Sequence, residues 1–144
     1  MKLLLVLSLF FNIALAEEQT IIGQWFYIAK IYQGIEIPEH PESTLRLHFD
    51  FSVDGQSRLY WWHQNEGDFC ERIGKYRIEA GNLVDEVTWI NPKNSPGCGL
   101  DPDMQLGRVT TTAISFRGSE LLLHLYIGNE PLIYVWKKIA PEEQ

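Results

Sequence analysis

Few side chains in this 144-residue sequence have the types and spacing that acid–base, nucleophilic or metal chemistry needs. The histidines are scattered along the chain, at His40, His48, His63 and His124. None of them belongs to a His-Glu-x-x-His or Gly-x-Ser-x-Gly motif. Asp101 and Asp103 flank a proline, but two carboxylates are too few to enclose a calcium ion, and we interpret this stretch as a capped turn. We therefore expect no catalytic residue, no metal site and no cofactor, and we expect that the protein is not an enzyme.

The two cysteines, Cys70 and Cys98, are the remaining candidates for covalent chemistry. Neither belongs to a Cys-x-x-Cys pair or has a histidine beside it at metal-ligand spacing. In an exported protein, two such cysteines predict one disulfide. On the chain-entropy model it would contribute about 3.5 kcal/mol to stability. It would also pin the proline-rich and glycine-rich segment 91–103 to the strand that carries Cys70, as a braced connection or as a recognition surface.

Residues 1–16 have the form of a secretory signal peptide. A lysine precedes an apolar run over residues 3–11, and residues 14–16 (Ala-Leu-Ala) provide small side chains at the cleavage position. An uncleaved membrane anchor is the alternative, but the run is shorter than the roughly 20 residues that a spanning helix needs. No cysteine follows the cleavage position to carry a lipid. We expect a secreted or periplasmic protein without stable membrane insertion.

Residues 17–144, which remain after removal of the predicted signal peptide, have the length of one compact domain. The whole chain carries a formal net charge of −7. An acidic protein of this kind does not attract nucleic acid or anionic membranes. We therefore expect one soluble domain that does not bind nucleic acid.

Alternating apolar residues and regularly spaced turn residues predict an all-β fold. In residues 44–51, TLRLHFDF, apolar side chains alternate with polar ones, and His48 would lie on the solvated face. Connections such as Asp54-Gly55 are typical of hairpin turns. The predicted strands cover residues 23–32, 44–52, 57–64, 70–79, 82–90, 104–116, 120–127 and 132–139. About eight antiparallel strands in sequence order favour a single up-and-down barrel, because closure removes the exposed edges, and a two-sheet sandwich is the alternative.

A Gly-x-Trp motif, from Gly23 to Trp25, opens the first predicted strand and resembles the first signature of the lipocalins and the wider calycin group. The resemblance implies a barrel whose base the tryptophan closes, with a basic side chain from the last strand packed across it. Lys137 or Lys138 would be this basic residue, and cation–π attraction would hold it over the indole. Avidin-like barrels and the secreted bacterial inhibitors of metalloproteases begin in a similar way. In those inhibitors the amino-terminal segment enters the protease site.

The strand predicted at 57–64 is aromatic on both faces, because Trp61 and Trp62 point in opposite directions. One face would belong to the core or to a pocket. The other face would be covered by loops or by the amino-terminal segment, or it would form an interface with a protein partner. We also expect residues 33–43, which contain two prolines, to form a stiffened lid over the open end of the barrel.

The sequence pattern and the resemblance together predict a lipocalin-like barrel that binds a small hydrophobic or amphipathic ligand in its interior. The residues that we expect to line the ligand site are Tyr27, Leu47, Phe49, Leu59 and Trp61. The first alternative is a protein-binding module or protease inhibitor that acts through its rim loops or its amino-terminal segment. Further alternatives are a structural envelope protein with a filled barrel and an enzyme without a sequence motif.

Overall fold

The computed structural model describes residues 20–140, and the predicted signal peptide at residues 1–16 lies outside this part of the chain. Its nine strands form one antiparallel sheet. Within residues 20–140, no helix is long enough and apolar enough to cross a membrane. The strands are β1 (Gly23–Tyr32), β2 (Ile35–Pro38), β3 (Leu45–Phe51), β4 (Gln56–His63), β5 (Phe69–Glu79), β6 (Asn82–Ile90), β7 (Val109–Arg117), β8 (Glu120–Ile127) and β9 (Glu130–Lys138).

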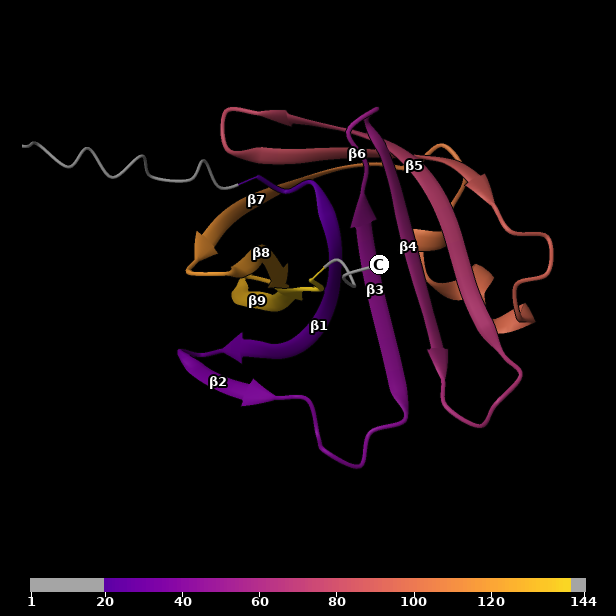
Figure 1. The fold of residues 1–144 in the computed structure, drawn as a ribbon, viewed down its shortest axis with the longest axis horizontal. Helices are drawn as coiled ribbons and strands as arrows, with labels where there is room; N and C mark the ends of the chain where they lie inside the picture. Colours follow the sequence, from indigo (N-terminus) through magenta and orange to yellow (C-terminus); the bar gives the residue numbers. More distant parts are fainter. Residues whose placement is uncertain (1–19, 141–144) are drawn as a thin grey trace, which may run out of the picture.

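The sheet closes into a barrel (Figure 1). Strands β3 to β9 pair in sequence order, and β1 pairs with β3 on one side and with β9 on the other. The pairing of β1 with β9 runs from Trp25 opposite Lys138 to Tyr32 opposite Leu132. The all-β, antiparallel up-and-down barrel that the turn spacing and strand alternation predict is therefore confirmed. It has eight strands, and β2 is an additional strand that pairs only with β1.

Part of the segment 33–43, which we predicted as a stiffened lid over the open end of the barrel, is the strand β2. It pairs with residues 29–32 of β1, whereas β3 pairs with residues 23–26 of the same strand. Gln33 and Gly34 connect β1 to β2 with φ values of 51° and 75°, as a tight hairpin turn requires. The sequence pattern did not indicate this strand because it is only four residues long and ends in a proline, which a sheet accepts at its edge.

Strand β7 begins at Val109 rather than near residue 104, as we predicted. The preceding residues form two short 3-10 helices, η1 (Pro96–Leu100) and η2 (Pro102–Met104). Proline suits the first position of a helical turn because its missing N–H would have had no partner there. The side chain of Asp101 accepts a hydrogen bond of 2.8 Å from the backbone N–H of Asp103, so the Asp-Pro-Asp stretch is a capped turn.

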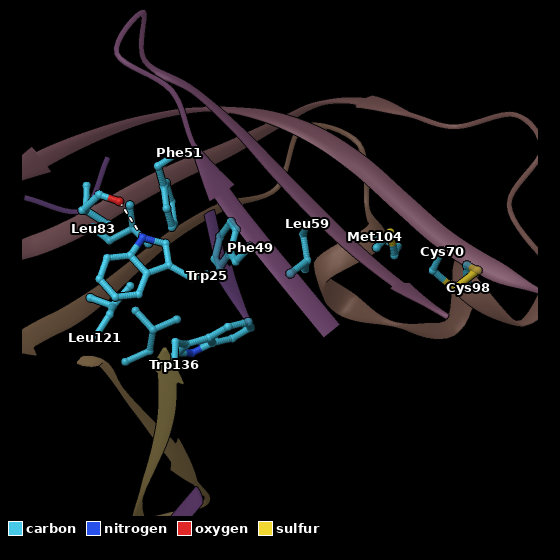
Figure 2. Close-up of a cluster of buried hydrophobic side chains, with 12 residues drawn as sticks. Trp25, Phe49, Phe51, Leu59, Cys70, Leu83, Cys98, Met104, Leu121 and Trp136 are labelled. Atoms are coloured by element: carbon cyan, nitrogen blue, oxygen red, sulfur yellow. Dashed lines mark hydrogen bonds between the residues drawn. A yellow bond between two sulfur atoms is a disulfide. The ribbon is translucent and has the colours of Figure 1, made fainter. Parts of the chain in front are cut away.

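Trp25 closes the core at one end of the barrel (Figure 2). Only 2% of its surface is exposed, and its Nε1–H donates a hydrogen bond of 2.7 Å to the carbonyl oxygen of Ile21. Of the two lysines that the resemblance offered, Lys138 lies over the indole, with Nζ 5.3 Å from a ring centroid. A Cβ atom on Gly23 would lie 2.5 Å from Cε of Lys138. The glycine of the Gly-x-Trp motif thus leaves room for the lysine that covers the tryptophan.

The aromatic side chains on the outer face of the barrel pack against one another. The ring of Tyr60 lies 4.9 Å from that of Trp62 and 5.9 Å from that of Phe69, measured between centroids. His48 stacks on Trp62, with centroids 5.2 Å apart and planes 24° apart. The prediction that His48 is solvated is therefore wrong, because the neighbouring indole half-buries it. This burial lowers the pKa of His48 below its ordinary value.

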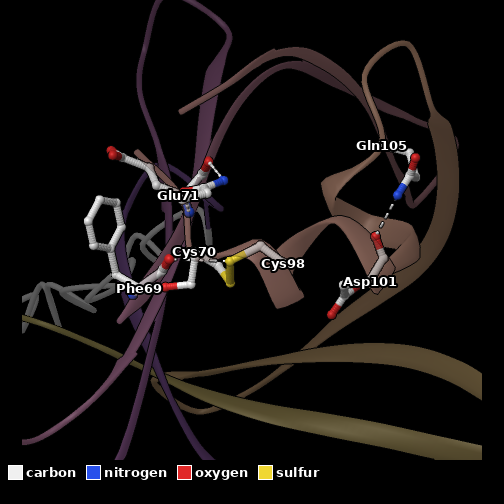
Figure 3. The surroundings of a disulfide bond; sticks show 8 residues. Phe69, Cys70, Glu71, Cys98, Asp101 and Gln105 are labelled. Atoms are coloured by element: carbon white, nitrogen blue, oxygen red, sulfur yellow. Dashed lines mark hydrogen bonds between the residues drawn. A yellow bond between two sulfur atoms is a disulfide. The ribbon is translucent and has the colours of Figure 1, made fainter. Parts of the chain in front are cut away.

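The disulfide predicted between Cys70 and Cys98 is confirmed (Figure 3). It joins β5 to η1, with the two Cα atoms 5.6 Å apart. Asn94 adds two hydrogen bonds to Glu71 of the same strand, because its side chain accepts from the Glu71 N–H at 2.8 Å and donates to the Glu71 carbonyl at 2.9 Å. The segment 91–103 is therefore braced against β5 at more than one point.

Candidate functional site

The inside of the barrel contains a cavity of about 790 Å³ that is open to solvent on part of its surface. A volume of this size falls within the range of small-molecule binding pockets. Much of its wall consists of aliphatic and aromatic side chains from five of the barrel strands. These apolar lining residues are Leu45, Leu47, Phe49, Leu59, Trp61, Leu83, Leu123, Leu125 and Trp136.

Four of the five residues that we predicted for the ligand site lie on one wall of this cavity. Leu47 is paired with Trp61, and Phe49 is paired with Leu59, across β3 and β4. Residues that face one another across an antiparallel pair and lie two positions apart along each strand share a face of the sheet. The alternating pattern of the two strands is therefore sufficient to assemble this wall.

Tyr27, the fifth predicted residue, is not among the residues that line the cavity. Its ring packs against Tyr134 and Trp136, with centroid distances of 5.3 Å and 5.9 Å, and both of these residues do line the cavity. Burial, together with the negative charge of Glu39, raises the pKa of Tyr27 to about 12. Tyr27 thus lies on the inner face beside its cross-strand partner Trp136 and packs against the wall residues without itself lining the cavity.

A buried ion pair contributes polar atoms to the cavity wall. Arg72 Nη2 lies 2.7 Å from Asp85 Oδ2, and the two side chains are 5% and 2% exposed. Ser57 Oγ donates a hydrogen bond of 2.5 Å to Asp85 and accepts one of 3.2 Å from Arg72. The guanidinium carbon of Arg72 also lies 5.3 Å from the centroid of the Phe49 ring. The charge of each partner is therefore offset inside the barrel, as burial of charges requires.

The braced segment before β7 brings two carboxylates to the cavity. Asp101 and Asp103 both line it, together with Arg108 and Tyr134. Burial, and next the charge of Asp101, raise the pKa of Asp103. Burial also raises the pKa of the Tyr134 hydroxyl, and the charges of Asp103 and Asp101 add to this effect. One part of the cavity is therefore polar and predominantly acidic.

Sequence reasoning missed these polar lining residues. Arg72 and Asp85 lie in strands that we predicted, and extending the inward-facing alternation along those strands would have placed both side chains in the barrel. Asp101, Asp103 and Arg108 carry no such signal, because they belong to an irregular segment. Among residues 20–140, no group of three or more His, Cys, Asp or Glu side chains is arranged to hold a metal ion.

Solved bacterial structures share this barrel. The chain is similar to a lipocalin-like protein from Bacteroides uniformis at 16% identity, with a TM-score of 0.56, over 82% of this chain and 97% of that one. It is also similar to an uncharacterized protein from Bacteroides eggerthii at 17% identity, with a TM-score of 0.50, over 82% and 98% of the two chains. No protein-family model and no curated protein matches the sequence. The chain therefore has a lipocalin-like fold.

Proposed function

We propose that this protein is a secreted or periplasmic binding protein that holds one small hydrophobic or amphipathic ligand inside its barrel, without chemical conversion of that ligand. The observation that carries the proposal is the cavity of about 790 Å³ with its apolar wall. A filled barrel, as in a purely structural protein, would not leave such a volume. The ligand would bind mainly because its apolar surface leaves water.

The apolar wall is large enough for useful affinity. Transfer of apolar surface from water contributes roughly 25 cal/mol per Å². A ligand of modest size can therefore gain enough free energy to bind at micromolar concentration after the cost of immobilisation. The polar atoms around Asp101, Asp103 and Arg108 favour an amphipathic ligand, because a pure hydrocarbon would leave these groups without new partners.

The proposed location rests on two features of the chain. The disulfide between Cys70 and Cys98 is stable in an oxidising compartment. Residues 1–16 have the sequence pattern of an export signal. Both features support a site of action outside the cytoplasm.

Fluorescent probe binding tests the proposed function. An anilinonaphthalene probe should bind the purified protein, and Trp61→Ala should weaken this binding about tenfold because the variant removes one large apolar side chain from the wall. Trp62→Ala is the matched control, since Trp62 is the adjacent residue on the same strand and packs on the outer face. It should leave the dissociation constant unchanged.

The proposal would be wrong if the folded wild-type protein bound no apolar probe. Equal weakening by the two tryptophan variants would also contradict it, because the probe would then not distinguish the inside of the barrel from the outside. Native mass spectrometry of protein purified from its own source gives an independent test. It should show an added mass that is lost on denaturation.

A further inference from the structure

The ladder between β7 and β8 ends before either strand does. Its pairs run from Arg117 opposite Glu120 to Ala113 opposite His124. Among residues 20–140, β7 pairs beyond that point only with β6, down to Val109, and β8 pairs only with β9, up to its end. Figure 1 shows β7 next to β8 near its arrowhead and curving away from it at its other end. The barrel wall is therefore split between residues 109–112 of β7 and residues 125–127 of β8.

The hydrogen-bonding pattern on the β8 side shows which backbone groups face the split. Ile127 and Glu130 flank the two-residue turn between β8 and β9, so they form a hydrogen-bonded pair. Pairs alternate along an antiparallel ladder between bonded and non-bonded. Tyr126 and Pro131 are thus a non-bonded pair, which suits a proline without an N–H. The N–H and C=O groups of Tyr126 therefore point away from β9, toward the split.

The same alternation applies to β7. The carbonyl of Arg108 accepts a hydrogen bond from Val87, and the N–H of Ile114 donates one to the carbonyl of Gly81, so both residues bond toward β6. Even-numbered residues of this stretch thus bond toward β6, and Thr111 directs its N–H and C=O groups to the other side. Thr111 is also the residue that would face Tyr126 if the ladder with β8 continued.

The split connects the cavity to solvent. Residues 109–113 of β7 and 123–126 of β8 all line the cavity without interruption. In a strand only alternate side chains face one way, so consecutive lining residues mean that the backbone edges themselves form the wall. Tyr126 is 71% exposed and Val109 is 57% exposed. A molecule in the barrel can therefore reach two strand edges whose backbone groups have no ladder partner in the part of the chain that the structure describes.

We infer that the ligand of this barrel carries a secondary amide next to its apolar part, and that this amide pairs with the free edges at Thr111 and Tyr126. This inference rests on the proposed function. Addition of an extended amide to a sheet edge obtains affinity from main-chain hydrogen bonds, and an adjacent pocket for an apolar group adds specificity. An acyl amide and a short extended peptide with a large apolar side chain share this chemistry.

The charges around the cavity favour an uncharged amide over a carboxylate. The positive charge of Arg72 is already offset by Asp85 at 2.7 Å. Asp101 and Asp103 line the same cavity and would repel a ligand carboxylate. Apart from Arg72, Arg108 is the one arginine or lysine among the described lining residues. An amide presents both a donor and an acceptor, as the two strand edges do.

The experiment compares two ligands that differ only at their amide groups. One is N-dodecanoyl-glycine methylamide, and the other has oxygen in place of both N–H groups, which removes the donors but preserves the length and the apolar chain. Displacement of the anilinonaphthalene probe gives the affinity of each. The amide should bind about tenfold more tightly than the ester, as one or two added hydrogen bonds allow. Acetyl-Gly-Phe-Gly-methylamide tests whether the natural ligand is a peptide. If the natural apolar group is an acyl chain, this peptide should displace the probe only at a higher concentration than the acyl amide. If the natural apolar group is an amino-acid side chain, the peptide should displace the probe at a lower concentration.

Two variants at one position test the role of the backbone. Thr111→Pro removes the N–H that faces the split and leaves the bonds to β6 intact, because proline is accepted where the N–H of a strand points away from its neighbour. It should weaken binding of the amide and of the ester alike, by up to about tenfold, because both ligands carry a carbonyl oxygen that would accept a hydrogen bond from this N–H. Thr111→Val keeps the N–H and replaces the hydroxyl with a methyl group, so it should retain the wild-type affinity for both ligands.

Equal affinity of the amide and the ester for the wild-type protein would overturn the inference but would leave the proposed function intact, because the probe would still bind. An affinity for both ligands that is unchanged in Thr111→Pro would also overturn it. Absence of probe binding to the wild-type protein would instead contradict the proposed function. Far-ultraviolet circular dichroism of each variant confirms that the barrel is folded before affinities are compared.

Discussion

Gly74 provides the space for the buried network of Ser57, Arg72 and Asp85. A Cβ atom at position 74 would lie 2.5 Å from Ser57 Oγ, 2.7 Å from the carbonyl oxygen of Glu86 and 2.8 Å from Asp85 Oδ1. These neighbours are a backbone atom and short side chains in a closed network, so they cannot move aside easily. The absence of a side chain at Gly74 is therefore a condition for burying this ion pair.

We predict that Gly74→Ala lowers the free energy of unfolding by about 2–4 kcal/mol, because overpacking would separate Ser57 and Asp85 or displace the strand. Urea unfolding measures this change. Gly67→Ala is the matched control, since a Cβ atom at Gly67 would meet nothing within 4 Å, and it should change stability by less than about 0.5 kcal/mol. Similar stability of the two variants would show that the network tolerates a methyl group.

At the scale of elements, the segment 91–103 has the greatest influence on the site. It is irregular apart from its 3-10 helices, yet it brings Asp101 and Asp103 to the cavity. The disulfide and the hydrogen bonds of Asn94 fix its position against β5. Ser95 and Asn91 add further hydrogen bonds to Phe69 and Glu71 of β5, so the segment that carries the two carboxylates is held along much of its length.

We predict that the double variant Cys70→Ser/Cys98→Ser loses about 3.5 kcal/mol of stability. The variant has no cross-link between these two positions, which are 28 residues apart, and the unfolded chain therefore has a higher conformational entropy. Urea unfolding of the oxidised wild type and the variant measures this loss. Hydrogen exchange should also show faster exchange of the segment 91–103, while β1 and β9 keep their protection. Unchanged exchange in the segment would mean that its hydrogen bonds hold it without the disulfide.

At the scale of the whole molecule, closure of β1 against β9 makes the barrel a single cooperative unit around one cavity. Single domains of this size usually unfold in one transition. A ligand that binds only inside the closed barrel has no site on the unfolded chain. Ligand binding must therefore shift the unfolding equilibrium of the entire domain.

We predict a single thermal transition whose midpoint rises when the anilinonaphthalene probe is present. At a free concentration of 100 times its dissociation constant, the probe should add about 2.7 kcal/mol of stability. Differential scanning calorimetry at several probe concentrations measures the shift, and Trp61→Ala should need about ten times more probe for the same shift. A midpoint that does not respond to the probe would contradict binding inside the barrel.

The sequence by itself determined the eight barrel strands, apart from the start of β7, and one wall of the cavity. The alternation of side chains between the two faces is a local property of β3 and of β4. It places Leu47, Phe49, Leu59 and Trp61 on one face of the sheet independently of the other strands. The Gly-x-Trp motif similarly indicated how Trp25 and a lysine of the last strand meet, because both positions lie at the ends of strands that a barrel must join.

Only the tertiary structure decided which other groups reach the cavity. The position of Asp101 and Asp103 depends on a disulfide to β5 and on two proline-initiated turns, so no periodic pattern encodes it. The split between β7 and β8 arises because each strand pairs with two neighbours over different lengths, and pairing length depends on the curvature of the closed sheet. Tyr27 packs on the inner face against the rings of Tyr134 and Trp136, and these two residues line the cavity where alternation alone had assigned Tyr27.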